Sequence, residues 1–302
     1  MHTPALFTRL SIGLFLGAIA LHAQVPATPM PVPDVVAIQR PSPADVAQAS
    51  DALKRFQAQA DPATQALLAK YPDLLAVRPP RVNPCVVPYL LPGFRTKHAN
   101  NVARAKQGGI DLLFMGDSIT DFWRNSGPEG VDNPPRAGKK VFDQYYGGIK
   151  TANFGISGDT TQGVLYRLRD GEGQGFQPKA IMLMIGTNNA SAMCSSAEIA
   201  EGVGAIVLEL RKDFPDAKIL LLGIFPRGYP EDLIRKVVLA VNPIIARLDD
   251  GQHVFYRDIG AKFLDANGVL QADIMADKLH PNEKGYVIWA EAVKPTLAEL
   301  LK

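Results

Sequence analysis

Serine, histidine and aspartate residues occupy positions from which they could carry out nucleophilic catalysis. Ser118 follows Asp117 at the end of an apolar run, and His280 follows Asp277 by three residues in a loop that Pro281 stiffens. A serine hydroxyl attacks a carbonyl when a histidine accepts its proton and a carboxylate holds the histidine ring. We therefore take Ser118 as the candidate nucleophile, His280 as the candidate base and Asp277 as the residue that orients the base.

Two further segments offer hydrogen-bond donors for a negatively charged oxygen. Gly158 lies in a turn before a predicted helix, where a backbone N–H can approach a ligand closely and the helix dipole favours an anion. Asn188, in the segment Gly-Thr-Asn-Asn, carries an amide that can stabilise an oxyanion. Each of these residues also has an ordinary structural explanation, because Ser, Asp and Thr cap helices and Gly-Thr-Asn-Asn suits a turn.

Short apolar runs precede these polar segments and alternate with segments of helical character. The runs are 110–116, 149–155, 179–186, 217–224 and 253–259. Because they are apolar throughout, they are typical of strands buried on both faces. Helices are expected near 138–146, 159–169, 196–213, 231–249 and 283–301. This alternation predicts a parallel sheet between helices, whose ligand site lies at the carboxyl ends of the strands. The candidate residues fall at those ends or just before the last helix.

Taken together, the polar segments resemble the four sequence blocks of the GDSL or SGNH hydrolases. The matching blocks are Gly116-Asp117-Ser118-Ile119, Asn153 to Gly158, Gly186-Thr187-Asn188-Asn189 and Asp277 to Pro281. Ile119 replaces the leucine of the family name, which affects no catalytic group. The resemblance covers roughly residues 95–302, and within the family it is similar to the platelet-activating-factor acetylhydrolase catalytic subunits and their bacterial relatives.

The resemblance implies a flavodoxin-like three-layer α/β/α sandwich with a five-stranded parallel sheet. It implies that Ser118, His280 and Asp277 are catalytic, and that the N–H groups of Ser118 and Gly158 form an oxyanion hole with the Asn188 side chain. It implies no metal and no organic cofactor. The expected activity is hydrolysis of carboxylic esters of carbohydrates or lipids, with short acyl groups such as acetyl preferred. An acyltransferase using the same site, or an idle module that binds glycans or lipids, is the alternative.

The first part of the chain predicts export. Arg9 precedes the apolar stretch Leu10 to Leu21, which predicts a signal peptide over residues 1–23. The stretch is shorter than the roughly 20 residues of a spanning helix, and a retained membrane anchor is the alternative. Residues 24–43 are proline-rich and are expected to form an extended or disordered linker. Residues 44–94 are expected to form a helical extension leaning on the main domain, residues 95–302, of a secreted or periplasmic protein.

Charge and cysteine content narrow the classes of partner. The 32 Lys and Arg nearly balance the 30 Asp and Glu without long runs of one sign, so no nucleic-acid partner and no membrane-surface partner is expected. The expected partner is a small-molecule or glycan ester. Cys85 and Cys194, the two cysteines, pair in an oxidising compartment if the fold brings them together, or remain separate thiols.

Overall fold

A parallel five-stranded sheet forms the centre of the protein in a computed structural model that describes residues 27–77 and 79–302. The strand order is β2-β1-β3-β4-β5, and every neighbouring pair is parallel. The strands are β1 (Leu112–Gly116), β2 (Thr151–Asn153), β3 (Ala180–Met184), β4 (Lys218–Leu222) and β5 (Val254–Arg257). Each lies within one of the apolar runs, as predicted. The signal peptide expected over residues 1–23 lies outside the described residues.

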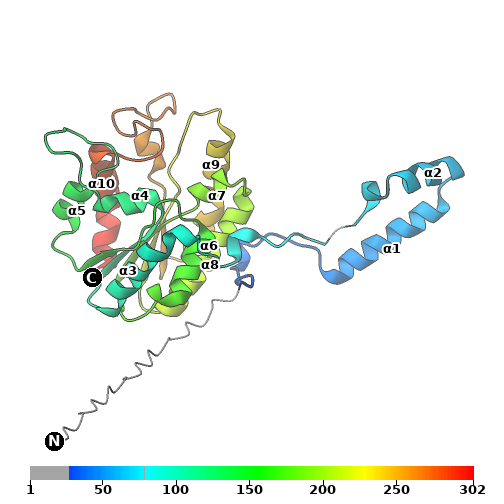
Figure 1. Ribbon diagram of the computed structural model, residues 1–302, viewed down its shortest axis with the longest axis horizontal. Coiled ribbons are helices and arrows are strands. Elements are labelled where there is room, and N and C mark those ends of the chain that lie inside the picture. Colours follow the sequence, from blue (N-terminus) through cyan, green and yellow to red (C-terminus); the bar gives the residue numbers. More distant parts are fainter. Residues whose placement is uncertain (1–26, 78) are drawn as a thin grey trace, which may run out of the picture.

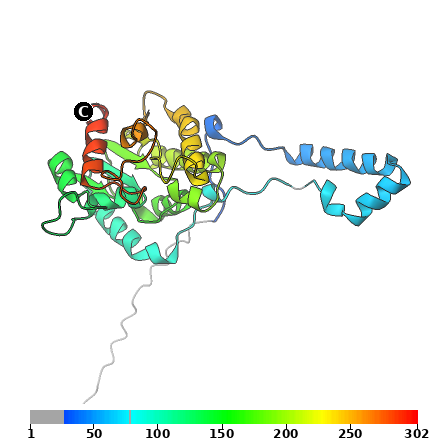
Figure 2. The ribbon, with the colours of Figure 1, turned by 90° about the horizontal axis from the view of Figure 1, so that it is seen from above.

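Helices cover both faces of the sheet (Figures 1 and 2). One face packs against α5 (Lys139–Tyr146) and α10 (Glu283–Leu300). The other packs against α6 (Thr161–Arg167), α8 (Ser196–Asp213) and α9 (Leu233–Ile245). The remaining α-helices are α1 (Pro43–Gln59), α2 (Pro62–Lys70), α3 (Arg95–Lys106), α4 (Ser118–Asp121) and α7 (Thr187–Ser191). The predicted α/β/α sandwich is therefore confirmed.

The alternation of side chains along each strand builds two separate hydrophobic cores. In β1, Leu113 and Met115 enter one core, while Leu112 and Phe114 enter the other. All residues of β1 and β3 are buried, which explains why these strands are apolar throughout. Burying one such side chain contributes about 1.5–3 kcal/mol, so the central strands are fixed firmly and their carboxyl ends form a rigid edge.

Residues 27–42, which precede the helices α1 and α2, pack on the main body. Met30 and Val36 are buried, and the carboxylate of Glu201 in α8 accepts hydrogen bonds from the Ile38 N–H at 2.8 Å and the Arg40 guanidinium at 2.7 Å. The Asn83 amide donates to the same carboxylate at 2.7 Å. The expectation of a linker over residues 24–43 is therefore wrong for much of its described part, because buried apolar side chains and an ion pair fix it.

Residues 43–77 form an arm that projects from the body (Figures 1 and 2). It contains α1 and α2, and Asp61 between them is the N-cap of α2. Neither helix has a buried residue, so the expectation that this extension leans on the main domain is wrong here. Local contacts stabilise the helices instead, because Ser42 caps α1 in a capping box with Asp45 and the Asp61 carboxylate caps α2.

Candidate active site

The strand β1 delivers Ser118 to the carboxyl edge of the sheet. Asp117 caps the short helix α4, and its carboxylate accepts the Ile119 N–H at 3.0 Å. A Cβ at Gly116 would lie 2.3 Å from the Met184 carbonyl, so only glycine allows this close packing of β1 on β3. Ser118 is the first residue of α4, and its N–H therefore has no partner within the helix. Its hydroxyl and its N–H are both available at this edge.

The loop before α10 brings His280 and Asp277 to Ser118. The Ser118 Oγ lies 2.9 Å from His280 Nε2, and His280 Nδ1 lies 2.8 Å from Asp277 Oδ2. The second carboxylate oxygen of Asp277 accepts the backbone N–H groups of Leu279 and His280 at 3.1 and 2.8 Å, which fixes the turn. The structure thus joins these three predicted residues in one hydrogen-bonded chain, although Ser118 and His280 are 162 positions apart.

The surroundings of Asp277 and His280 determine their protonation states. Burial alone would raise the pKa of Asp277, but hydrogen bonds from the His280 backbone and ring and from Arg136 outweigh it and hold this pKa well below its usual range. Burial lowers the pKa of His280, and the hydrogen bond to Asp277 opposes this change without cancelling it. Near pH 7 an ionised Asp277 therefore holds a neutral ring, whose Nε2 can accept the Ser118 proton.

Gly158 and Asn188 lie on the same edge, after β2 and β3. Gly158 has φ +85°, a left-handed conformation that favours glycine. Asn188 is the second residue of α7, and its side-chain Nδ2 donates to the carbonyl of Asp159 at 2.8 Å. An amide nitrogen carries two protons, so one N–H of Asn188 remains for a ligand. Ser118, Gly158 and Asn188 therefore follow the carboxyl ends of β1, β2 and β3, and the loop before α10 adds His280 and Asp277 beside Ser118.

The sequence did not single out two residues that support this site. Arg136 donates to Asp277 Oδ2 at 3.0 and 2.7 Å from a loop 141 positions away. The Phe122 ring lies 5.0 Å from the His280 ring and 6.0 Å from the Arg136 guanidinium. No local pattern marks either residue, because only the tertiary fold places them beside the histidine.

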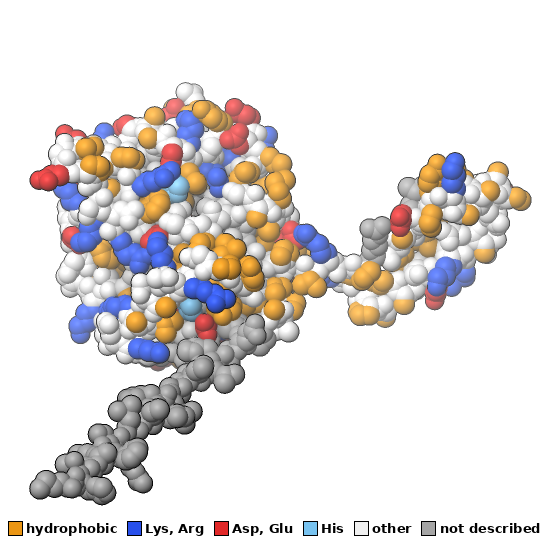
Figure 3. All heavy atoms as spheres, viewed as in Figure 1, with side chains coloured by type: hydrophobic (Ala, Val, Ile, Leu, Met, Phe, Trp, Pro, Cys, Tyr) orange, Lys and Arg blue, Asp and Glu red, His pale blue; other side chains and the backbone are white. Residues whose placement is uncertain are grey.

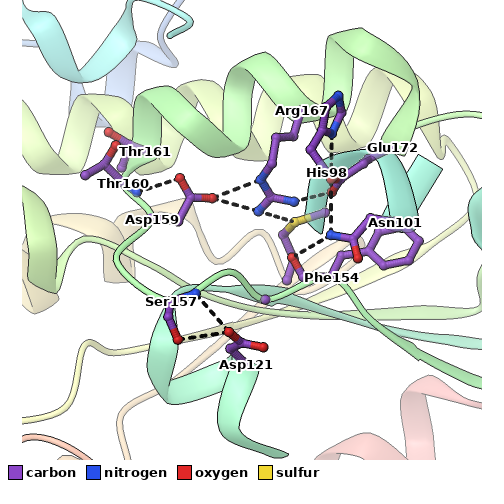
Figure 4. Close-up of polar contacts among 12 residues, drawn as sticks. His98, Asn101, Asp121, Phe154, Ser157, Asp159, Thr160, Thr161, Arg167 and Glu172 are labelled. Atoms are coloured by element: carbon purple, nitrogen blue, oxygen red, sulfur yellow. Dashed lines mark hydrogen bonds and ion pairs between the residues drawn. The ribbon is translucent and has the colours of Figure 1, made fainter. Parts of the chain in front are cut away.

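His98, in α3, lies outside this site. It is buried, with Nδ1 2.9 Å from Glu172 (Figure 4) and Nε2 3.0 Å from Asp170. Glu172 pairs in turn with Arg167, which binds Asp159, the residue after Gly158. Within residues 27–77 and 79–302, no cluster of three or more His, Cys, Asp or Glu residues is arranged to hold a metal ion.

The two cysteines lie close to this edge. Both are buried free thiols, and the Cys194 N–H donates to the carbonyl of Asn189 at 3.1 Å. Asn189, next to Asn188, donates to Cys85 Sγ at 3.3 Å. Burial raises the pKa of the Cys85 thiol. Both cysteines thus contact Asn189 as free thiols, and their pairing in an oxidising compartment stays a prediction.

Comparisons with known proteins place this geometry in context. A family model described as GDSL-like lipase/acylhydrolase matches residues 114–288. Platelet-activating factor acetylhydrolase IB subunit alpha2 of Rattus norvegicus is 29% identical over 227 residues, which cover 73% of this chain and 93% of that protein. A Streptococcus pneumonia protein named for platelet activating factor has a similar fold, with TM-score 0.53 and 21% identity, covering 68% of this chain and 94% of its own. A lipolytic G-D-S-L protein of Veillonella parvula gives TM-score 0.50 at 19% identity, with 63% and 98% covered.

Proposed function

Since the chain belongs to the GDSL-like lipase/acylhydrolase family, we propose that it is a serine esterase acting through an acyl-enzyme on Ser118. The observation that carries the proposal is the continuous hydrogen-bonded chain from Ser118 Oγ through the His280 ring to Asp277, with distances of 2.9 and 2.8 Å. In this proposal Ser118 is the nucleophile, His280 the general base and Asp277 the residue that orients the ring.

The reaction proceeds in two halves. Ser118 Oγ attacks the ester carbonyl carbon while His280 Nε2 takes the hydroxyl proton, and the C–O bond to the alcohol then breaks as His280 returns that proton to the leaving oxygen. Water attacks the acyl-enzyme in the second half, and its proton passes through His280 to Ser118. The developing oxyanion is held by the N–H groups of Ser118 and Gly158 and by the Asn188 side chain.

The proposed substrates are short-chain esters, acetyl above all, of carbohydrates or lipids. The name of the rat relative, an acetylhydrolase, supports this choice. A cleft of about 400 Å³ beside Asp277 is lined by charged residues, among them Arg227 and Lys278, and by the apolar Leu233, Ile234 and Leu279. This mixed lining suits an alcohol portion that carries both polar and apolar groups. On the face drawn in Figure 3, charged side chains of both signs are likewise dispersed over the body.

The Phe94 ring lies beside Gly158, where we place the acyl group of the substrate. The Phe94 ring comes within 3.4 Å of the position that a Cβ on Gly158 would occupy. A long acyl chain gains about 0.8 kcal/mol per buried CH₂ only where an apolar groove continues. A half-buried ring at the Gly158 turn interrupts such a groove and supports short acyl groups.

The test is kcat/KM for p-nitrophenyl esters with acyl chains of two to twelve carbons. The expected maximum is at acetyl, with Ser118→Ala as the background control. Phe94→Ala should raise the activity on the eight-carbon ester relative to acetyl, whereas Tyr89→Ala, which removes an exposed ring from the same segment, should leave that ratio unchanged. A wild-type maximum at eight carbons or beyond would contradict the short-chain proposal.

Export is part of the same proposal and rests on the sequence alone. The motive is Arg9 followed by the apolar stretch from Leu10 to Leu21. Mature protein isolated from its native host should begin near Gln24 when its N-terminus is measured by mass spectrometry. An intact Met1 in that material would refute a cleaved signal peptide.

A further inference from the structure

The three proposed oxyanion donors come from three separate segments of the chain. Ser118 begins α4 after β1, Gly158 lies in the turn after β2, and Asn188 lies in α7 after β3. Their mutual distances must nevertheless be fixed before substrate binds, because a donor stabilises the oxyanion only when it is preorganised. Two buried carboxylates, Asp121 and Asp159, connect these segments.

Asp121 joins the nucleophile helix to the Gly158 turn. It is the last residue of α4, and its Oδ2 accepts the Ser157 backbone N–H at 3.0 Å and the Ser157 hydroxyl at 2.9 Å (Figure 4). Lys97 and Arg124 also pair with this carboxylate. The residue just before Gly158 is therefore attached to the helix that starts at Ser118.

Asp159 joins the same turn to Asn188. Its backbone carbonyl accepts the Asn188 Nδ2 at 2.8 Å. Its fully buried carboxylate accepts Arg167 Nε at 2.9 Å and Nη2 at 2.8 Å through one oxygen, and the Thr160 N–H at 2.8 Å through the other (Figure 4). These contacts fix the orientation of the residue that orients the Asn188 amide.

The residues around the Asp159 carboxylate leave room for it and neutralise its charge. A Cβ at Gly163 in α6 would lie 1.8 Å from the Asp159 Oδ1, so the helix needs glycine at this position. The Arg167 guanidinium has no solvent exposure and also pairs with Glu172, which Asn101 and His98 contact. The carboxylate is therefore held against the protein interior and not against solvent.

We propose that Asp121 and Asp159 are positioning residues that set the places of the Gly158 N–H and the Asn188 amide relative to Ser118. This inference rests on the proposed esterase function and adds residues to its oxyanion hole. Neither carboxylate touches substrate in this account. A misplacement of about 1 Å can reduce a rate about 100-fold, and an oxyanion donor acts mainly in the transition state, so kcat should change more than KM.

The first test is Asp121→Asn, which keeps the size of the side chain and removes its charge and one acceptor. We expect kcat for p-nitrophenyl acetate to fall roughly 10-fold to 100-fold, with KM changed less than about 3-fold. Glu201→Gln is the matched control, because Glu201 is a buried carboxylate whose hydrogen-bond partners are Ile38, Arg40 and Asn83 and not one of the three oxyanion donors. Its kcat should stay within about 2-fold of wild type.

The second test is a double-mutant cycle that a merely structural role would not satisfy. Asn188→Ala alone should lower kcat about 100-fold or more. If Asp159 acts through Asn188, then Asp159→Asn should cost much less in the Asn188→Ala background than in wild type. The milder Ser157→Ala, which removes one bond to Asp121, keeps the inference testable if Asp159→Asn fails to fold, and it should lower kcat about 3-fold to 10-fold at unchanged KM.

The outcomes separate this inference from the proposed function. Ser118→Ala measured in parallel tests the function, and its inactivity upholds the function whatever the other variants do. The positioning role is overturned if folded Asp121→Asn keeps wild-type kcat, if it changes only KM, or if the effects of Asp159→Asn and Asn188→Ala are independent. Circular dichroism and thermal unfolding of each variant show which proteins are folded.

Discussion

His280 is the residue whose protonation state decides whether the site can start a reaction. Its ring is half-buried, and burial lowers its pKa from the ordinary value of 6.5 because it disfavours the imidazolium. As the general base it acts when neutral, so kcat/KM should rise with pH and become constant above a midpoint that lies below pH 6.5. A pH profile of acetyl ester hydrolysis checks this, and a midpoint above pH 7 would contradict it.

Arg136 provides a sharper form of that pH test. Its positive charge lowers the pKa of His280, and it also shares the Asp277 carboxylate with the histidine. Removing it in Arg136→Met should therefore raise the His280 pKa and move the midpoint of the profile to higher pH. Lys140→Met is the matched control, because it removes the same positive charge from a residue that pairs with Glu283. An equal shift in both variants would assign the effect to overall charge instead of this contact.

At the scale of elements, hydrophobic patterning predicted more of the structure than polar patterning did. The five strands and the helix over residues 196–213 follow from apolar content and period, because a buried strand or an amphipathic helix needs many matching side chains. The short helices α4 and α7 have four and five residues, too few to show a period. The sequence placed their residues correctly at the active edge but described Gly-Thr-Asn-Asn as a possible turn.

The supporting contacts could not be predicted for a related reason. Arg136 and Asp121 act through partners from distant segments, whereas Arg167 reaches Asp159 and Glu172 eight and five positions away. No pattern in one sequence specifies that these residues pair. The triad candidates were found because His280 and Asp277 lie three residues apart and the blocks occur together. The same limit explains why the packing of residues 43–77 was not predicted. The sequence pattern of an amphipathic helix does not show whether the rest of the protein covers its apolar face.

A disulfide between Cys85 and Cys194 would attach helix α7 to the segment around Cys85. Cys194 follows α7, and Asn189 of α7 contacts both cysteines, because its side chain donates to Cys85 Sγ and its carbonyl accepts the Cys194 N–H. Refolding with glutathione disulfide, which accepts the two electrons, should give a Cys85–Cys194 cross-link detectable by non-reducing peptide mass spectrometry. The oxidised protein should unfold about 5 °C or more above the Cys85→Ser, Cys194→Ser variant. Two free thiols after oxidative refolding would contradict this.

For the molecule as a whole, catalysis and the arm should be separable. Every site residue lies on the sheet edge or in the loops around it, whereas α1 and α2 bury no residue. Replacing residues 43–77 by a short Gly-Ser linker should leave kcat/KM for p-nitrophenyl acetate within about 2-fold and the unfolding temperature nearly unchanged. The flanking contacts of Arg40 and Asn83 with Glu201 must be retained. A large loss of activity would show that the arm contributes to the site.

The chemistry of the whole molecule depends on one nucleophile, and covalent labelling tests it most directly. An organofluorophosphonate should form one adduct, located on Ser118 by peptide mass spectrometry, and inactivate the protein in proportion to labelling. Folded Ser118→Ala should show no adduct and should lose at least about 1000-fold in p-nitrophenyl acetate hydrolysis. An adduct on another residue, or near wild-type hydrolysis by Ser118→Ala, would contradict the proposed mechanism.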